Sequence, residues 1–455
     1  MVTSKPTQAE LDLFTIKASP TKEFFIRMLT KDITLTDAIG DLIDNSVDGA
    51  NRTAQSEKLK NLSGFEVKII ATNEKFEISD NCGGIDVDIA RKYAFRFGRP
   101  AEYKIEKDSI GQFGIGMKRA FFKIGRRIKV NSVSNNSKFE TNLDVDDWQD
   151  KDAWDFPLDP KDNLSTIPLD ERGTIISISS LTDEAKNNFG TDTIFETALI
   201  DEISCEHLYN ISKGIKITIN GHLVKPPKLT LKYDDDIKPA FWHNTFENGL
   251  TVDIVAGISE DKGSEGGWYI FCNDRLITGP NTDDSTGWTG KGKDKDGVAV
   301  YHDQFYRFRG YVFFHSEDAS KLPWNTTKTG VDRESGIYQN VRKQMISMMR
   351  PVMTLMNQLK TEKEKDRPKS ERVLNLRIDN ARIVSVSDVL KDKKKLKDTF
   401  LWPKIKVTPQ TGLGKISYQK PYSEIDEAKK YFKVTKLGEV GEKTFDFFYN
   451  QKIGK

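Results

Sequence analysis

A predicted helix in the first part of the chain carries an unusual number of acidic side chains on one face. Apolar residues recur at three- and four-residue spacing and form one stripe: Leu35, Ala38, Ile39, Leu42, Ile43, Val47 and Ala50. The opposite face carries four aspartates and one asparagine: Asp37, Asp41, Asp44, Asn45 and Asp48. Carboxylate and amide oxygens suit Mg²⁺, and a carboxylate can also orient a water molecule. The alternative is a solvated acidic face, in which like charges repel.

Two glycine-containing motifs follow this helix. A strand predicted at KFEISD runs into DNCGGID, residues 80–86, and GQFGIG, residues 111–116, opens a predicted helix. A glycine-rich segment before a helix can present backbone N–H groups to a phosphate, helped by the helix dipole. Each motif alone is weak evidence, because many glycine loops are simply turns. The three features in this order favour a nucleotide site over a solvated acidic helix.

The ordered trio resembles the GHKL ATPases, the superfamily of gyrase, MutL, MORC, Hsp-type chaperones and histidine kinases. It looks closest to MORC, MutL and bacterial relatives of that kind. The resemblance implies a Bergerat-type α/β sandwich that binds ATP and Mg²⁺, within a chain of α+β class. The P-loop motif G-x-x-x-x-G-K-[ST] does not occur in the sequence.

The resemblance also implies a role for individual residues. Asp41 stands where relatives have the glutamate that orients water, and Asn45 would bind Mg²⁺. Asp80 would accept a hydrogen bond from the adenine amine, with Thr174 of RGTIISI in support. The remaining nucleotide contacts are expected from Gly84, Gly111, Gly114, Gly116 and Lys118. Residues 96–116 would form the ATP lid.

Two residues depart from the pattern of the family. Asp41 is one methylene shorter than the usual glutamate, so we expect slow hydrolysis. Cys82 replaces the first glycine of the second motif, and Gly83 with Gly84 would have to preserve the turn.

A second unit is predicted from residue 232 onward. GWYIFCNDRLIT, residues 267–278, resembles a strand and turn of the transducer domain that follows the ATPase domain in MutL, MORC and gyrase. Such transducers send one lysine to the γ-phosphate. Lys328 is our candidate, because it lies in WNTTKTG between the last predicted strand and a long helix. A surface lysine is the alternative, and Arg275 is expected to be structural.

The sequence therefore predicts three parts. Residues 1–231 would form the ATP-binding domain with an N-terminal arm, residues 232–360 a βαβ transducer domain, and residues 361–455 a linker with a small C-terminal α/β module. In this module a strand is expected at 415–421, followed by helices at 422–432 and 437–450. This order suits either a small packing domain or a DNA-binding ribbon-helix-helix module.

Composition narrows the functional classes further. The 455 residues are 37% hydrophobic and 30% charged, with a formal net charge of +2, which neither requires nor excludes nucleic acid. The three cysteines form no CxxC pair, so a structural metal site is not expected. No apolar run of about 18 residues occurs, so we expect no membrane segment and a cytoplasmic protein.

We expect an ATPase that acts as an ATP-gated clamp or switch, forms a homodimer on ATP binding and hydrolyses ATP slowly. The anticipated client is double-stranded DNA, in genome maintenance or in defence against phage and other foreign DNA, and a partner effector protein is also considered. The alternative is an ATP-gated protein interaction module, or a chaperone-like protein, with little hydrolysis.

Overall fold

The computed structural model describes residues 20–98, 110, 114–190, 193–260, 263–290, 297–325, 327–364, 372–404 and 416–454. The chain divides into two compact units. Unit 1 comprises the chain up to Glu362 together with Val373–Lys404, and unit 2 comprises Lys363–Arg372 and Ile405–Lys455. The chain is of α+β class, as the sequence predicts.

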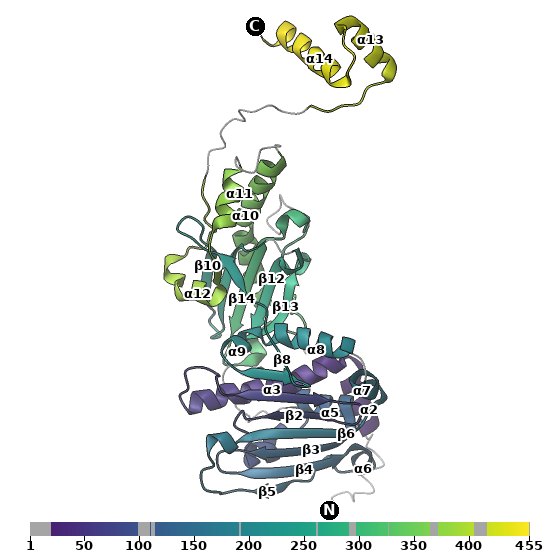
Figure 1. Ribbon diagram of the computed structural model, residues 1–455. Coiled ribbons are helices and arrows are strands. Elements are labelled where there is room, and N and C mark those ends of the chain that lie inside the picture. The colour runs from purple at the N-terminus through teal and green to yellow at the C-terminus, as the bar shows by residue number, and fades with distance from the viewer. Residues whose placement is uncertain are drawn as a thin grey trace, which may run out of the picture. The chain divides into compact units, whose positions relative to one another are not determined.

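An eight-stranded sheet holds the first half of unit 1 together (Figure 1). Its spatial order is β5-β4-β3-β6-β2-β1-β7-β8, and all neighbours are antiparallel except β1 and β7. The strands are β1 (Glu66–Ala71), β2 (Phe76–Asp80), β3 (Gly125–Val133), β4 (Lys138–Asp144), β5 (Asp159–Lys161), β6 (Gly173–Leu181), β7 (Lys216–Ile219) and β8 (His222–Leu223). In β1, buried Val67 and Ile69 alternate with exposed Lys68 and Ile70. One face of the sheet is therefore covered, and the other meets solvent.

Helices supply the covering layer. The 22-residue α3 (Leu35–Ser56) packs against α5 (Gly116–Ile124), and every apolar residue of its predicted stripe is buried. A capping box between Thr34 and Asp37 starts α3. The other helices here are α2 (Lys22–Lys31), α4 (Val87–Ile89), the π-helix η1 (Ala90–Ala94), α6 (Val145–Gln149), α7 (Asp183–Phe189), α8 (Thr193–Glu206) and α9 (Leu208–Ser212).

A five-stranded sheet, ordered β10-β11-β14-β12-β13, forms the second half of unit 1. Its strands are β10 (Ala240–Thr245), β11 (Thr251–Ile258), β12 (Gly267–Cys272), β13 (Arg275–Asn281) and β14 (Phe308–His315). Ile270 and Val312 share one core cluster with Met345 of α10 (Gly336–Glu364), while Phe271 and Phe313 stack at 4.8 Å in a second cluster. Both faces of the central strands are therefore buried, and their hydrophobic residues do not alternate with polar ones.

Shorter elements complete both units. Strands β9 (Thr230–Lys232) and β15 (Ile383–Ser385) pair with each other, and α11 (Val373–Asn380) and α12 (Val386–Lys391) flank β15. In unit 2, α13 (Tyr422–Phe432) and α14 (Leu437–Lys452) form a helical hairpin. Residues 416–421, which were expected to belong to a strand, form none. No helix in the described parts of the chain is long and apolar enough to cross a membrane.

Candidate functional site

Three aspartates on the acidic face of α3 are buried: Asp41, Asp44 and Asp48. Asp37 accepts hydrogen bonds from the backbone N–H of Thr34 at 3.1 Å and from its hydroxyl at 2.6 Å. Further along, Asp48 accepts the backbone N–H of Ile110 at 2.8 Å. The two ends of the acidic face therefore hold the helix start and a residue of the expected lid.

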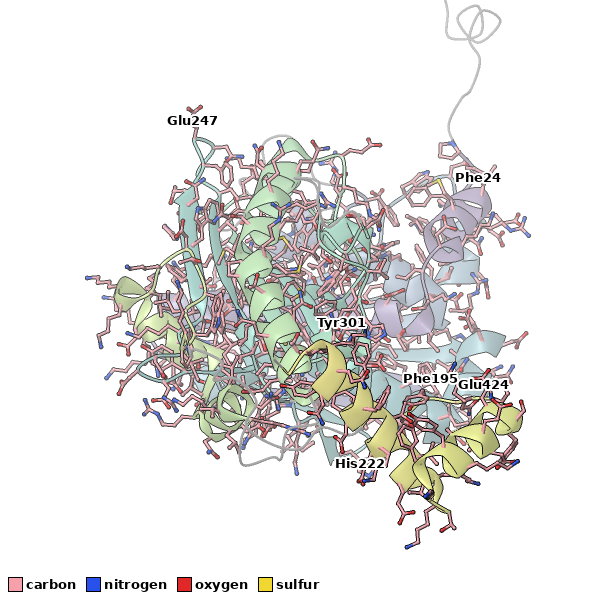
Figure 2. All side chains as sticks on the ribbon, turned by 90° about the horizontal axis from the view of Figure 1, so that it is seen from above. Phe24, Phe195, His222, Glu247, Tyr301 and Glu424 are labelled. Carbon is pink, nitrogen blue, oxygen red and sulfur yellow. The ribbon has the colours of Figure 1, made fainter. Side chains whose placement is uncertain are left out.

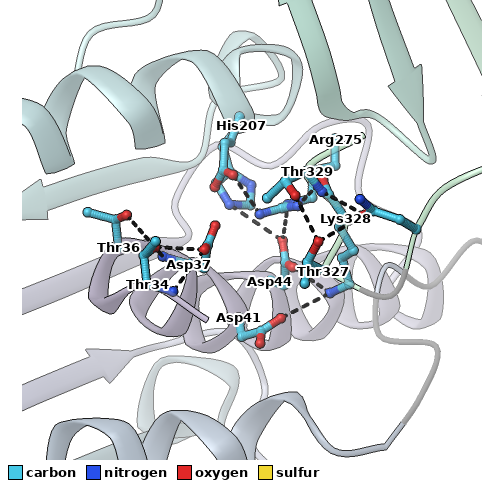
Figure 3. A network of polar contacts seen from close by, with 12 residues as sticks. Thr34, Thr36, Asp37, Asp41, Asp44, His207, Arg275, Thr327, Lys328 and Thr329 are labelled. Carbon is cyan, nitrogen blue, oxygen red and sulfur yellow. Dashed lines mark hydrogen bonds and ion pairs between the residues drawn. The ribbon is translucent and has the colours of Figure 1, made fainter. Parts of the chain in front are cut away.

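Asp41 and Asp44, between these ends, face cations from distant parts of the chain (Figure 3). Asp41 lies 2.5 Å from Arg119 Nε and 3.4 Å from Lys328 Nζ. Asp44 lies 2.7 Å from Lys328 Nζ and 2.9 Å from Arg275 Nε. The two carboxylates are 4% and 1% exposed, so their pairing is shielded from solvent. Burial alone would raise the pKa of Asp44, but the charges of Arg275 and Lys328 lower it to about 2.

Lys328 is thus no surface lysine. Its side chain is 6% exposed, and its backbone has φ 60°, a conformation that non-glycine residues rarely adopt. The Arg275 guanidinium donates a hydrogen bond to the carbonyl of Lys328 at 3.2 Å, which helps to hold this conformation. Arg275 is itself buried, and it joins the backbone of Lys328 to Asp44 and Glu206.

Two further titratable groups adjoin Asp44. The Arg275 guanidinium pairs with Glu206 at 2.8 Å, and Nε2 of His207 lies 3.6 Å from Asp44. Burial raises the pKa of Glu206 to about 7 and lowers that of His207 to about 4. Desolvation penalises the charged form of each residue, so the two shifts are opposite in sign.

Asn45 is exposed beside this cluster. Its amide nitrogen donates to the carbonyl of Asp41 at 2.8 Å, which leaves the amide oxygen to act as an acceptor or ligand. Such an oxygen fits Mg²⁺, which in proteins often takes few side-chain ligands and completes its shell with phosphates and water. The described residues contain no group of three or more His, Cys, Asp or Glu that could hold a metal without such help.

Asp80 lies at the end of β2, next to the turn that follows it. Its carboxylate accepts hydrogen bonds from the hydroxyl of Ser46 at 2.7 Å and from the backbone N–H groups of Cys82 at 2.9 Å and Thr174 at 3.3 Å. The Thr174 hydroxyl lies 2.9 Å from that of Ser132. Burial raises the pKa of Asp80, while these donors oppose the shift. Asp80 and Thr174 thus lie together on neighbouring strands, and Ser46 joins them to α3.

The turn after Asp80 contains two glycines with positive φ directly after Cys82. Gly83 and Gly84 have φ of 97° and 71°, which glycine adopts readily. A Cβ atom on Gly84 would lie 1.9 Å from the carbonyl oxygen of Val133. The close approach of the two backbones therefore requires glycine at this position.

The structure describes only part of the third motif, residues 114–116. Gly111 and most of residues 96–116 lie outside the described residues, whereas Gly114 has φ 65° and Gly116 starts α5 against Asp41. The buried ammonium of Lys118 donates hydrogen bonds to the carbonyls of Ala94, at 2.9 Å, and of Gly114. It joins the two ends of the expected lid, and its proposed charge near the phosphates stays a prediction.

Arg119, Glu206 and His207 belong to the cluster, although sequence reasoning did not assign them to it. Arg119 directly follows Lys118, shortly after the third motif. This position was the one signal in the sequence that could have assigned Arg119 to the site. Glu206 and His207 belong to no motif that the sequence analysis recognises. Their proximity to Asp41 and Asp44 arises from tertiary packing.

Comparison with known families agrees with this geometry. The family model described as histidine kinase-, DNA gyrase B-, and HSP90-like ATPase matches residues 33–174. This match spans α3, the turn after Asp80, α5 and the start of β6. Among the curated proteins, none matches the chain. Residues 33–174 are therefore identified as a GHKL-type ATPase domain, a class that binds ATP.

Proposed function

We propose that this chain is an ATP-gated switch that binds Mg-ATP and hydrolyses it slowly. Asn45 would ligate Mg²⁺, Asp80 and Thr174 would recognise adenine, and backbone N–H groups near Gly84 and the third motif would hold the phosphates. Mg²⁺ would neutralise charge on the phosphates. The match to a GHKL-type ATPase domain supports this assignment.

The contacts of Asp41 carry the proposal of slow hydrolysis. The candidate base is paired with Arg119 at 2.5 Å and with Lys328 at 3.4 Å. A carboxylate held by two cations is less free to orient a water molecule than an unpaired one. This observation also favours the alternative, an ATP-gated interaction protein with little hydrolysis.

Lys328 would couple nucleotide to assembly. It contacts Asp44 at 2.7 Å, so a γ-phosphate would compete with this carboxylate for the ammonium. We propose that ATP-bound protomers form a homodimer that acts as a clamp, with double-stranded DNA as the client. Genome maintenance or defence against foreign DNA would be the setting, and a MORC- or MutL-like relationship would fit such a role.

Calorimetry on Asn45→Ala tests nucleotide binding. Loss of the amide oxygen should remove detectable Mg-ATP binding while the fold remains. Asn188→Ala is a matched control, because Asn188 makes the same contact to the carbonyl four residues earlier, at 2.8 Å, on α7. Unchanged ATP affinity in Asn45→Ala would exclude Asn45 from the site.

A phosphate-release assay distinguishes the slow ATPase, in which Asp41 orients water, from the interaction protein with little hydrolysis. If Asp41 orients water, Asp41→Ala should lower the rate at least roughly a hundredfold. The exposed Asp88→Ala serves as the control. Addition of long double-stranded DNA should raise the wild-type rate. Equal slow rates in wild type and Asp41→Ala would favour the non-hydrolysing alternative.

A further inference from the structure

Helix α5 contacts the carboxylate of Asp41 through two of its residues, Gly116 and Arg119, which we call the α5 contact face. They are three residues apart on the helix and therefore lie on the same side of it. A Cβ atom on Gly116 would lie 3.0 Å from Cγ of Asp41 and 3.1 Å from each of its carboxylate oxygens. Because these distances are nearly equal, the plane of the carboxylate lies flat against Gly116.

The two oxygens of this carboxylate have different partners. Arg119 Nε donates a hydrogen bond to Oδ2 at 2.5 Å. Lys328 Nζ lies 3.4 Å from Oδ1 (Figure 3) and only 2.7 Å from Asp44, which is its closer partner. Oδ2 is therefore held by a short, directed contact within the ATPase domain, whereas Oδ1 has a long contact to a residue from the second half of unit 1.

Stability alone gives a weak reason for the pair of Arg119 and Asp41. Their side chains are 8% and 4% exposed, so both charged groups lose their hydration when the pair forms. This loss can cancel the attraction between the charges, and apolar side chains of similar volume are often as stabilising. A guanidinium N–H provides a property that apolar packing lacks, because it fixes the direction in which the carboxylate faces. The pair therefore suits the orientation of Asp41 better than the attachment of α5 to α3.

We propose that Arg119 is a positioning residue, which holds Asp41 through Oδ2 and directs Oδ1 toward the water that attacks the γ-phosphate of ATP. This inference rests on the proposed function, in which Asp41 orients this water and Lys328 moves to the γ-phosphate. When Lys328 moves, Oδ1 loses its cation while Oδ2 keeps its hydrogen bond to Arg119. Asp41 thus becomes available to water only after Lys328 has engaged the nucleotide.

The reaction leaves Arg119 outside the bonds that change. Oδ1 accepts a proton from the water, whose oxygen forms a bond to the γ-phosphorus. The bond from this phosphorus to the bridging oxygen breaks, and that oxygen leaves with ADP. The proton then passes to solvent, which restores the carboxylate. Loss of the Arg119 contact should therefore lower turnover without changing nucleotide binding.

Steady-state phosphate release by the full chain tests the proposal with Arg119→Met, which keeps the bulk of the side chain and removes its N–H donors. Its kcat should fall at least about tenfold, because a misplaced carboxylate orients water poorly. The KM, and the ATP affinity measured by calorimetry, should stay those of the wild type. Arg119→Lys, which restores a cation, should recover part of the loss. Lys123→Met is the matched control and should keep the wild-type kcat, because Lys123 of α5 pairs with Glu184, at 2.8 Å.

An Asp41→Ala background separates positioning from a general effect on the fold. If Arg119 acts through Asp41, adding Arg119→Met to Asp41→Ala should lower kcat no further. Gly116→Ala displaces the same carboxylate without removing a charge, so it should lower kcat alone but not beside Asp41→Ala. A wild-type kcat in Arg119→Met, or the same loss of kcat with and without Asp41, would overturn the proposal. A wild type that binds Mg-ATP but releases no phosphate would instead contradict the proposed hydrolysis itself, and this inference with it.

Discussion

Glu206 and His207 are neighbours in the chain and approach the same buried cluster, yet burial shifts their pKa values in opposite directions. The pKa of Glu206 rises to about 7, so the folded protein keeps a proton that the unfolded chain loses near pH 4.5. Its contribution to stability is present below about pH 4.5 and is lost as pH rises to about 7. The pKa of His207 falls to about 4, so its contribution is lost as pH falls from 6.5 to 4.

Glu206→Gln should therefore remove the loss of stability that Glu206 contributes as pH rises from about 4.5 to about 7. Between pH 5 and pH 7.5 the free energy of unfolding of this variant should fall less than that of the wild type, by on the order of 2 kcal/mol. Urea titrations at the two pH values measure the difference. Glu247→Gln, at an exposed side chain labelled in Figure 2, should behave as the wild type does. An equal decline in Glu206→Gln and wild type would contradict the pKa shift.

The residues of the site differ in how far the sequence reveals them. Asp41 and Asn45 are one helical turn apart, and Asp80 is fixed by a local strand and turn, so motif spacing finds them. Arg119 and Glu206 reach the same cluster from α5 and α8. Their partners lie 78 and 69 residues away, and nothing in local spacing encodes such contacts.

At the scale of elements, the turn after β2 depends on glycine for steric reasons. Gly84→Ala should lower the free energy of unfolding by roughly 2–5 kcal/mol, from left-handed strain together with the clash against Val133. Gly64→Ala separates the two effects, because Gly64 has φ 100° but nothing within 4 Å of an added Cβ. That control should cost about 1 kcal/mol. Equal losses in thermal or urea unfolding would remove the clash as the cause.

Elements with a strong pattern were predictable, and elements that need a partner were not. The apolar stripe of α3 repeats over four turns. The helices α13 and α14 begin at the residues that the sequence predicts, Tyr422 and Leu437. Residues 416–421 have apolar and aromatic side chains typical of a strand but pair with no other strand. A strand is stable only in a sheet, so the local residue types alone led to the wrong prediction of a strand in this segment.

At the scale of the whole molecule, Lys328 should decide whether ATP brings two ATPase domains together. Lys328→Ala should still bind ATP but fail to dimerise with a non-hydrolysable analogue, since a contact of about 2–4 kcal/mol would be lost only from the closed form. Light scattering with and without the analogue reports this association.

The control for Lys328→Ala is Lys321→Ala, because Lys321 is an exposed lysine seven residues earlier. It should dimerise with the analogue as the parent protein does. Equal analogue-induced dimerisation of Lys328→Ala and the parent protein would exclude a coupling role for Lys328.

The pairing of Asp44 with Lys328 also has a consequence for biosynthesis. The two residues are 284 positions apart, and β1 finds its parallel neighbour β7 only 150 residues downstream. At about 5–20 residues per second, a ribosome needs roughly 15–60 s to travel from Asp44 to Lys328. Arg275 is made only after 231 of these residues, and Lys328 only at the end of the interval, so the carboxylate lacks its full set of cations until then. The nascent ATPase domain therefore cannot bury this face of α3 in its final form until the five-stranded sheet has been made, and the two halves of unit 1 must mature together.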